Sequence, residues 1–128
     1  MLQQTCDPFS GKTEAILRFG GLEELYDRSV ERFRSNYRDS SALLLHLVLQ
    51  ERYEDAKILA HSLKGLAATL GMLDLHSCSE AVERAIKEGR YMDLPFLLHT
   101  YETSLCRVIQ SSAVHNSPAS GTGFCGMK

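Results

Sequence analysis

Apolar residues recur every three or four positions along most of the chain, the spacing that places them on one face of an α-helix. This pattern predicts a short helix over residues 13–19 and longer helices over 22–37, 53–70, 73–87 and 94–109. Residues 42–49 carry apolar side chains on nearly every side, so a helix there is expected to be covered on more than one side. The pattern therefore favours an all-α fold.

Glycine, proline and capping residues separate these predicted helices. Gly71 ends or bends one helix, and Asp93, followed by Pro95, can cap the last one. Short connections between long helices favour antiparallel neighbours. We expect an antiparallel up-and-down four-helix bundle with the short N-terminal helix packed on it. The predicted domain spans residues 13–111, between an N-terminal linker (1–12) and a flexible Ser/Gly-rich tail (112–128).

Composition and charge narrow the classes of function. The chain has 128 residues and a formal net charge of −2 with no basic cluster, so we expect one domain and no nucleic-acid partner. It contains neither a membrane-length apolar run nor a secretory leader, which predicts a cytoplasmic protein with no membrane partner. The four cysteines are widely spaced without a C-x-x-C pair; reduced thiols are favoured and no metal site is expected.

His61 is out of place on its helix. The core residues of the 53–70 helix are expected to be Ala56, Leu59, Leu63, Leu66, Ala67 and Leu70, with the four leucines defining its buried stripe. His61 lies on the opposite side of the helix, so we expect an exposed imidazole.

Lys57, Lys64, Gly65 and Ala68 share the face of His61. Glycine within a helix costs roughly 0.5 to 1 kcal/mol relative to alanine. A bare backbone at Gly65, extended by Ala68, would let another macromolecule approach the ring closely. The two lysines would add positive charge where a phosphoryl group or an acidic pocket could lie. These spacings make His61 the leading candidate for a functional residue.

The segment AHSLKGLAATLG, residues 60–71, resembles the H-x-L-K-G-x5-G signature of histidine-containing phosphotransfer (HPt) domains. It matches at His61, Leu63, Lys64, Gly65 and Gly71. The resemblance extends over residues 13–111 and does not include the tail.

The resemblance implies a phosphorelay intermediate. His61 would accept a phosphoryl group from a receiver aspartate of a response regulator, at the ring nitrogen farther from the backbone, and pass it to another receiver. Lys64 would neutralise phosphate charge, and Gly65 would keep the surface open. The receiver would supply Mg²⁺ and its own lysine, so this chain would bind no cofactor itself. A neutral imidazole is also a competent nucleophile near physiological pH without a dedicated base.

Autokinase activity is not expected. Ser62 follows His61, whereas dimeric histidine kinases place their phospho-acceptor in a segment like H-E-x-x-x-P, and the chain is too short for a separate ATP-binding domain. The chain could nevertheless be a free-standing shuttle or one module of a hybrid histidine kinase.

Two alternatives stay open at this level. One is a helical adaptor that binds a receiver or another signalling protein without carrying phosphate. The other is a structural bundle that dimerises through residues 42–49, against the expected monomer. A surplus apolar face of that segment, near residues 43–45, is also expected to flank His61 and to form a docking surface for the receiver. Leu45 would face outward, with lysines 57 and 64 at the rim, unless the short N-terminal helix covers this face.

The remaining histidines are expected to be ordinary. His76, His99 and His115 fall on charged or polar faces and in the tail. His46 is expected to be partly buried with a structural hydrogen bond.

Overall fold

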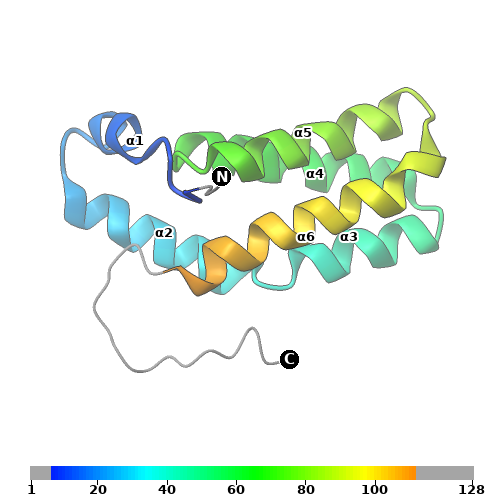
Figure 1. The fold of residues 1–128 in the computed structure, drawn as a ribbon, viewed down its shortest axis with the longest axis horizontal. Coiled ribbons are helices and arrows are strands. Elements are labelled where there is room, and N and C mark those ends of the chain that lie inside the picture. The colour runs from blue at the N-terminus through cyan, green and yellow to red at the C-terminus, as the bar shows by residue number, and fades with distance from the viewer. Residues whose placement is uncertain (1–6, 112–128) are drawn as a thin grey trace, which may run out of the picture.

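The computed structural model describes residues 7–111, a chain of helices joined by short connections (Figure 1). The helices of this region are α1 (Lys12–Arg18), α2 (Glu23–Tyr37), α3 (Ser40–Leu49), α4 (Tyr53–Thr69), α5 (Leu73–Lys87), the 3-10 turn η1 (Tyr91–Asp93) and α6 (Leu94–Gln110). The predicted all-α class is confirmed, and each predicted helix occurs within about two residues of its expected bounds.

Residues that disfavour a continuing helix set these bounds. Gly71 and Gly89 have φ angles of 75° and 72°, a left-handed conformation that most other residues avoid, and they follow α4 and α5. Asp39 and Asp93 occupy the N-cap positions of α3 and α6, although neither side chain makes a capping hydrogen bond. Pro95 lies in the first turn of α6, where no backbone N–H is needed.

Helices α3 to α6 surround most of the core, and α2 contributes Tyr26, Val30 and Phe33 to it. α3 packs against α4 and α6, and α5 packs against the same two helices. Figure 1 shows α2 and α3 following one another along one side, with successive helices from α3 to α6 running in opposite directions. The extensive α4–α5 interface is the one that matters for the site.

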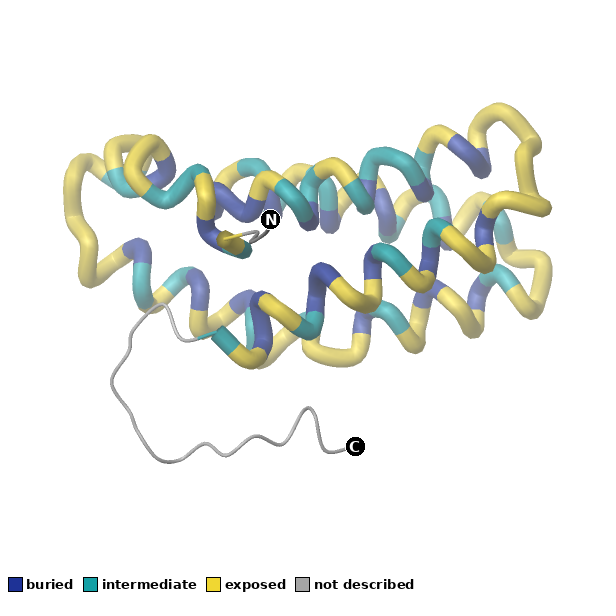
Figure 2. The backbone as a smooth tube through the Cα atoms, in the orientation of Figure 1, coloured by how far each residue is buried: buried dark blue, intermediate teal, exposed yellow. Residues whose placement is uncertain are grey.

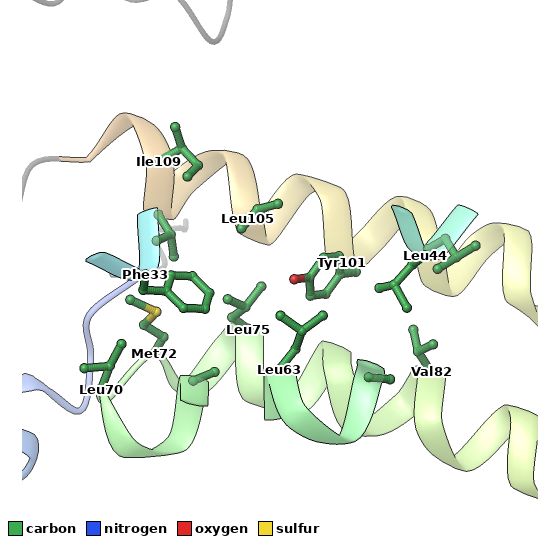
Figure 3. Close-up of a cluster of buried hydrophobic side chains, with 14 of the residues drawn as sticks. Phe33, Leu44, Leu63, Leu70, Met72, Leu75, Val82, Tyr101, Leu105 and Ile109 are labelled. Carbon is green, nitrogen blue, oxygen red and sulfur yellow. The ribbon is translucent and has the colours of Figure 1, made fainter. Parts of the chain in front are cut away.

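Buried residues line the inner faces of these helices along the length of the molecule (Figure 2). The core includes Phe33, Leu63, Met72, Leu75 and Tyr101, which point toward one another in Figure 3. The Tyr101 hydroxyl hydrogen-bonds Ser40 Oγ at 2.7 Å, which satisfies a polar group in the core. Burial raises the pKa of Tyr101 to about 12.

The helix α3 is less covered than expected. Leu44 and Leu47 are buried, but Leu43, Leu45 and Leu49 are exposed. α3 packs mainly against α4 and α6, which leaves these three leucines uncovered. The expectation that this segment is covered on more than one side is therefore wrong. His46 is also exposed rather than partly buried, since it lies opposite Leu44 on the helix.

Part of the expected N-terminal linker packs onto the bundle. Phe9 is buried, and the backbone N–H of Gly11 donates to the Gly71 carbonyl at 2.8 Å. The predicted tail (112–128), with His115, lies outside the described residues. Within 7–111 no helix is long and apolar enough to span a membrane, and no disulfide is present.

Candidate functional site

Small residues dominate the buried face of α4. Its fully buried side chains are Ala56, Ala60, Leu63 and Ala67, while Leu59 and Leu66 are only partly buried against the core. Burial of Ala56, Leu63, Ala67 and Leu70 is as predicted, but the predicted leucine stripe was centred too far toward Leu59 and Leu66. Alanine side chains are small, so they let a neighbouring helix approach α4 closely. The buried face of α4 is accordingly centred on its alanines.

His61 lies on the exposed side of α4, within reach of a side chain from α5. Its side chain is 66% exposed, so the predicted exposure of the imidazole is confirmed. It does not point freely into solvent, because Nδ1 lies 2.9 Å from Glu83 Oε2 on α5. The ring is thus anchored through one nitrogen.

Glu83 is the largely buried partner of both His61 and Lys64. Its side chain is only 12% exposed, and Lys64 Nζ lies 2.9 Å from its Oε1 as an ion pair. Burial acts to raise the pKa of the Glu83 carboxyl, but the hydrogen bonds and charges of Lys64 and His61 outweigh burial and lower that pKa. The carboxyl is therefore ionised at neutral pH.

An ionised carboxylate can only accept hydrogen bonds. In the neutral imidazole, Nδ1 must then carry the proton that it donates to Glu83 Oε2. The lone pair is left on Nε2, at the exposed end of the ring. This tautomer leaves the unprotonated nitrogen of His61 on the side of the ring away from the backbone.

Lys64 contacts α5 through both its backbone and its side chain. Its carbonyl lies 3.2 Å from His76 Nδ1, and its ammonium pairs with Glu83. His76 was expected to be ordinary surface, but it is partly buried and links α5 to α4. His99 is exposed, as expected.

Gly65 leaves bare backbone beside the site. It is exposed, and a Cβ atom built there would meet no heavy atom within 4 Å, apart from its own helix backbone and chain neighbours. Ala68, one turn on, is partly buried. Lys57, one turn before His61, lies 3.4 Å from Glu54 as an ion pair. The residues singled out on α4 thus form a row along the helix, which consists of Lys57, His61, Lys64, Gly65 and Ala68.

Glu83 was not predicted to be a site residue. The only signal in the sequence was its place on the polar face of the 73–87 helix, which carries no information about helix register. The residues of α3 were expected to flank His61, whereas the polar partner of the imidazole comes from α5. Leu45 is 45% exposed, so it faces outward as predicted.

Charged side chains continue the site along α5. A shallow groove beside Lys64 and Glu83 is also lined by Glu80, Arg84, Lys87 and Glu88. In the part of the chain described, no group of three or more His, Cys, Asp or Glu side chains is placed to hold a metal ion.

Comparison with known families agrees with this geometry. The family model for the Hpt domain matches residues 28–111, which contain His61, Lys64, Gly65 and Glu83. No curated protein and no solved structure matches the chain. Hpt domains carry out histidine phosphotransfer in two-component phosphorelays, and they interact with response-regulator receivers and kinases. On the match over most of its length, the chain belongs to the Hpt domain family.

Proposed function

We propose that His61 accepts a phosphoryl group from the aspartyl phosphate of a receiver domain and relays it to the aspartate of another receiver. The observation that carries this proposal is the exposed imidazole whose Nδ1 is hydrogen-bonded to Glu83. That contact leaves Nε2 unprotonated and accessible. A tautomer already in place needs no general base before attack.

The phosphoryl transfer needs no proton to leave His61. The Nε2–phosphorus bond forms while the bond from phosphorus to the aspartyl oxygen breaks, and the aspartate leaves as a carboxylate. The ring gains positive charge, because Nδ1 keeps its proton. Glu83, ionised and 2.9 Å from Nδ1, stabilises that charge as it develops.

We assign supporting roles to Lys64 and Gly65. Lys64 adds positive charge near the incoming phosphoryl group, and its ion pair with Glu83 limits where its ammonium can lie. The open space at Gly65 admits the receiver backbone. Phosphoryl transfer depends mainly on in-line positioning and charge stabilisation. Mg²⁺ and a further lysine would come from the receiver, and this chain itself would bind no cofactor.

The wider proposal follows from family membership and the fold. Helices α3 to α6 would form an up-and-down antiparallel four-helix bundle, with α2 extending it and α1 packed at one end. The chain would act as a cytoplasmic monomer and phosphocarrier without autokinase activity. Its partners would be receivers and, if it is one module of a larger protein, a hybrid histidine kinase.

Incubation with a panel of receiver domains, phosphorylated by a small phosphodonor such as acetyl phosphate, tests this proposal. The expected result is acid-labile, base-stable label on the wild-type chain from at least one receiver and none on His61→Gln. His99→Gln, at an exposed histidine away from the site, should label normally. Receiver binding without transfer would favour the adaptor alternative, and undiminished labelling of His61→Gln would overturn the assignment.

A further inference from the structure

The C-terminal end of α4 is closed by residues from the N-terminal segment. Nη1 of Arg18 donates to the carbonyls of Ala68 and Thr69, at 3.3 and 3.0 Å. The Tyr26 hydroxyl donates to the Leu70 carbonyl at 2.8 Å, and the Gly11 N–H serves Gly71 in the same way. The last carbonyls of a helix have no partner within that helix. The C-terminal end of the helix that carries His61 is therefore held by Arg18 of α1, by Gly11 before α1 and by Tyr26 of α2.

Arg18 differs from the lysines on the His61 face. Lys57 pairs with Glu54 and Lys64 pairs with Glu83, so a carboxylate offsets each ammonium. Within residues 7–111, Arg18 has no carboxylate within ion-pair distance. Glu14, one turn earlier on α1, forms no ion pair with it either. The negative end of a helix is equivalent to about half a charge, so the guanidinium keeps a net positive charge.

The position of this charge relates it to the site. Ala68 belongs to the row that contains His61, Lys64 and Gly65, and it lies about 10 Å from His61 along the helix axis. Figure 1 shows α1 at the end of the molecule where α4 passes into α5. Arg18 is exposed, and its bonds to two carbonyls hold the guanidinium over this end of the row. A receiver that covers His61 and Gly65 would extend toward Arg18.

We propose that Arg18 is a docking residue that forms an ion pair with an acidic side chain on the surface of the receiver. The docking surface then runs from Lys57 along α4 onto α1, outside the part of the chain that the family model matches. This inference rests on the proposed function, because the occupant is the receiver that exchanges phosphoryl with His61. A charge held in place before docking loses little side-chain freedom on binding.

Steady-state transfer from the fastest receiver of the panel tests the proposal in the full chain. Arg18→Gln keeps an N–H donor for the α4 carbonyls but loses the charge. We expect kcat/KM to fall about two- to fivefold, through KM, as for a partly exposed ion pair. Arg18→Glu should lower kcat/KM at least tenfold, because it places like charges together. The salt dependence of kcat/KM should weaken in Arg18→Gln.

Arg28→Gln is the matched control. It removes the same charge from an exposed arginine of α2, whose partner is Glu24, and should change kcat/KM less than about 1.5-fold. Equal kcat/KM and equal salt dependence for Arg18→Gln and Arg28→Gln would overturn the docking role while leaving the proposed function intact. A loss of kcat/KM in Arg18→Gln with unchanged salt dependence would also overturn it, in favour of helix capping. Failure of every receiver to label the wild-type chain would overturn both proposals.

Discussion

At the scale of single residues, the chemistry of this site depends on which nitrogen of His61 carries the proton. The buried carboxylate of Glu83 decides this, because it accepts a hydrogen bond only from a protonated Nδ1. Glu83 is itself kept ionised by Lys64 and His61. Three side chains from two helices thus fix one tautomer.

Glu83→Gln tests this arrangement. The pKa of Glu83 is lowered in the folded chain, so its ionised form stabilises the fold above the ordinary carboxyl pKa of 4.5. That stabilisation is lost as the pH falls through the lowered pKa. We expect Glu83→Gln to reduce the free energy of unfolding by about 1 to 2 kcal/mol at pH 7. The difference from wild type should shrink in acid, below pH 4.5, in urea unfolding.

Glu80→Gln serves as the control for this prediction. Glu80 pairs with Arg84 on an exposed face of α5, so its loss should cost less than about 0.5 kcal/mol. Glu83→Gln should also slow phosphoryl acceptance, whereas Glu80→Gln should not. Equal stability losses in the two variants at pH 7 would contradict the structural role given to Glu83.

Variants of Gly65 can test steric access to His61 separately from the stability of the fold. Its helical backbone and the open space around it mean that Gly65→Ala should raise the free energy of unfolding by up to about 1 kcal/mol. Gly65→Gln should keep the wild-type circular dichroism and melting behaviour but lose most phosphoryl acceptance. Full transfer by a folded Gly65→Gln variant would remove the argument that glycine is needed for access.

At the scale of helices, α4 is positioned by contacts at its end as well as along its side. One of these contacts joins Gly71, after α4, to Gly11, before α1. A Cβ atom at Gly71 would lie 2.4 Å from the Gly11 carbonyl oxygen, and Gly71 also has a φ of 75°. Both features require glycine at this position.

Gly71→Ala should therefore destabilise the chain more than a left-handed conformation alone would. A non-glycine residue in that conformation costs about 1 to 2 kcal/mol. Displacement of the α1 segment adds to that cost, so we expect Gly71→Ala to lower the free energy of unfolding by more than about 2 kcal/mol in all. Gly20→Ala is the control, since Gly20 has a φ of 72° with nothing within 4 Å. Thermal unfolding that shows equal losses for the two variants would rule out the close approach.

The exposed leucines of α3 give a second prediction at this scale. α1 packs against α2 and the end of α4, so it does not cover Leu45. Leu45→Asp should leave the fold intact and weaken receiver binding by more than about 1 kcal/mol. Met92→Asp, at a residue 91% exposed beyond α5, should leave both unchanged. Unchanged affinity in a folded Leu45→Asp variant, measured by calorimetry, would place the docking surface elsewhere.

At the scale of the whole molecule, periodicity predicted the helices well and their packing less well. Apolar spacing located α2, α4, α5 and α6 because each buries one face. It predicted the burial of Ala56 and Ala67 on α4, but it gave too much weight to Leu59 and Leu66, which are only partly buried. It also could not show the exposure of α3, which depends on how many helices surround it.

The site was predictable only where it lies on one helix. The spacing of His61, Lys64 and Gly65 along α4 is a local property, and all three lie where the sequence predicted. Glu83 and His76 reach the site through the packing of α5 on α4, and Arg18 reaches it through the packing of α1. Sequence spacing contains no information on these helix registers.

The central claim is that Nε2 of His61 carries the phosphoryl group. The most direct test is phosphorus–nitrogen NMR of the chain, labelled with ¹⁵N in histidine and phosphorylated by its receiver. We predict one phosphorus signal coupled to Nε2 of His61, with Nδ1 still protonated. Phosphorus coupled to Nδ1, to another histidine or to no histidine nitrogen at all would contradict the account.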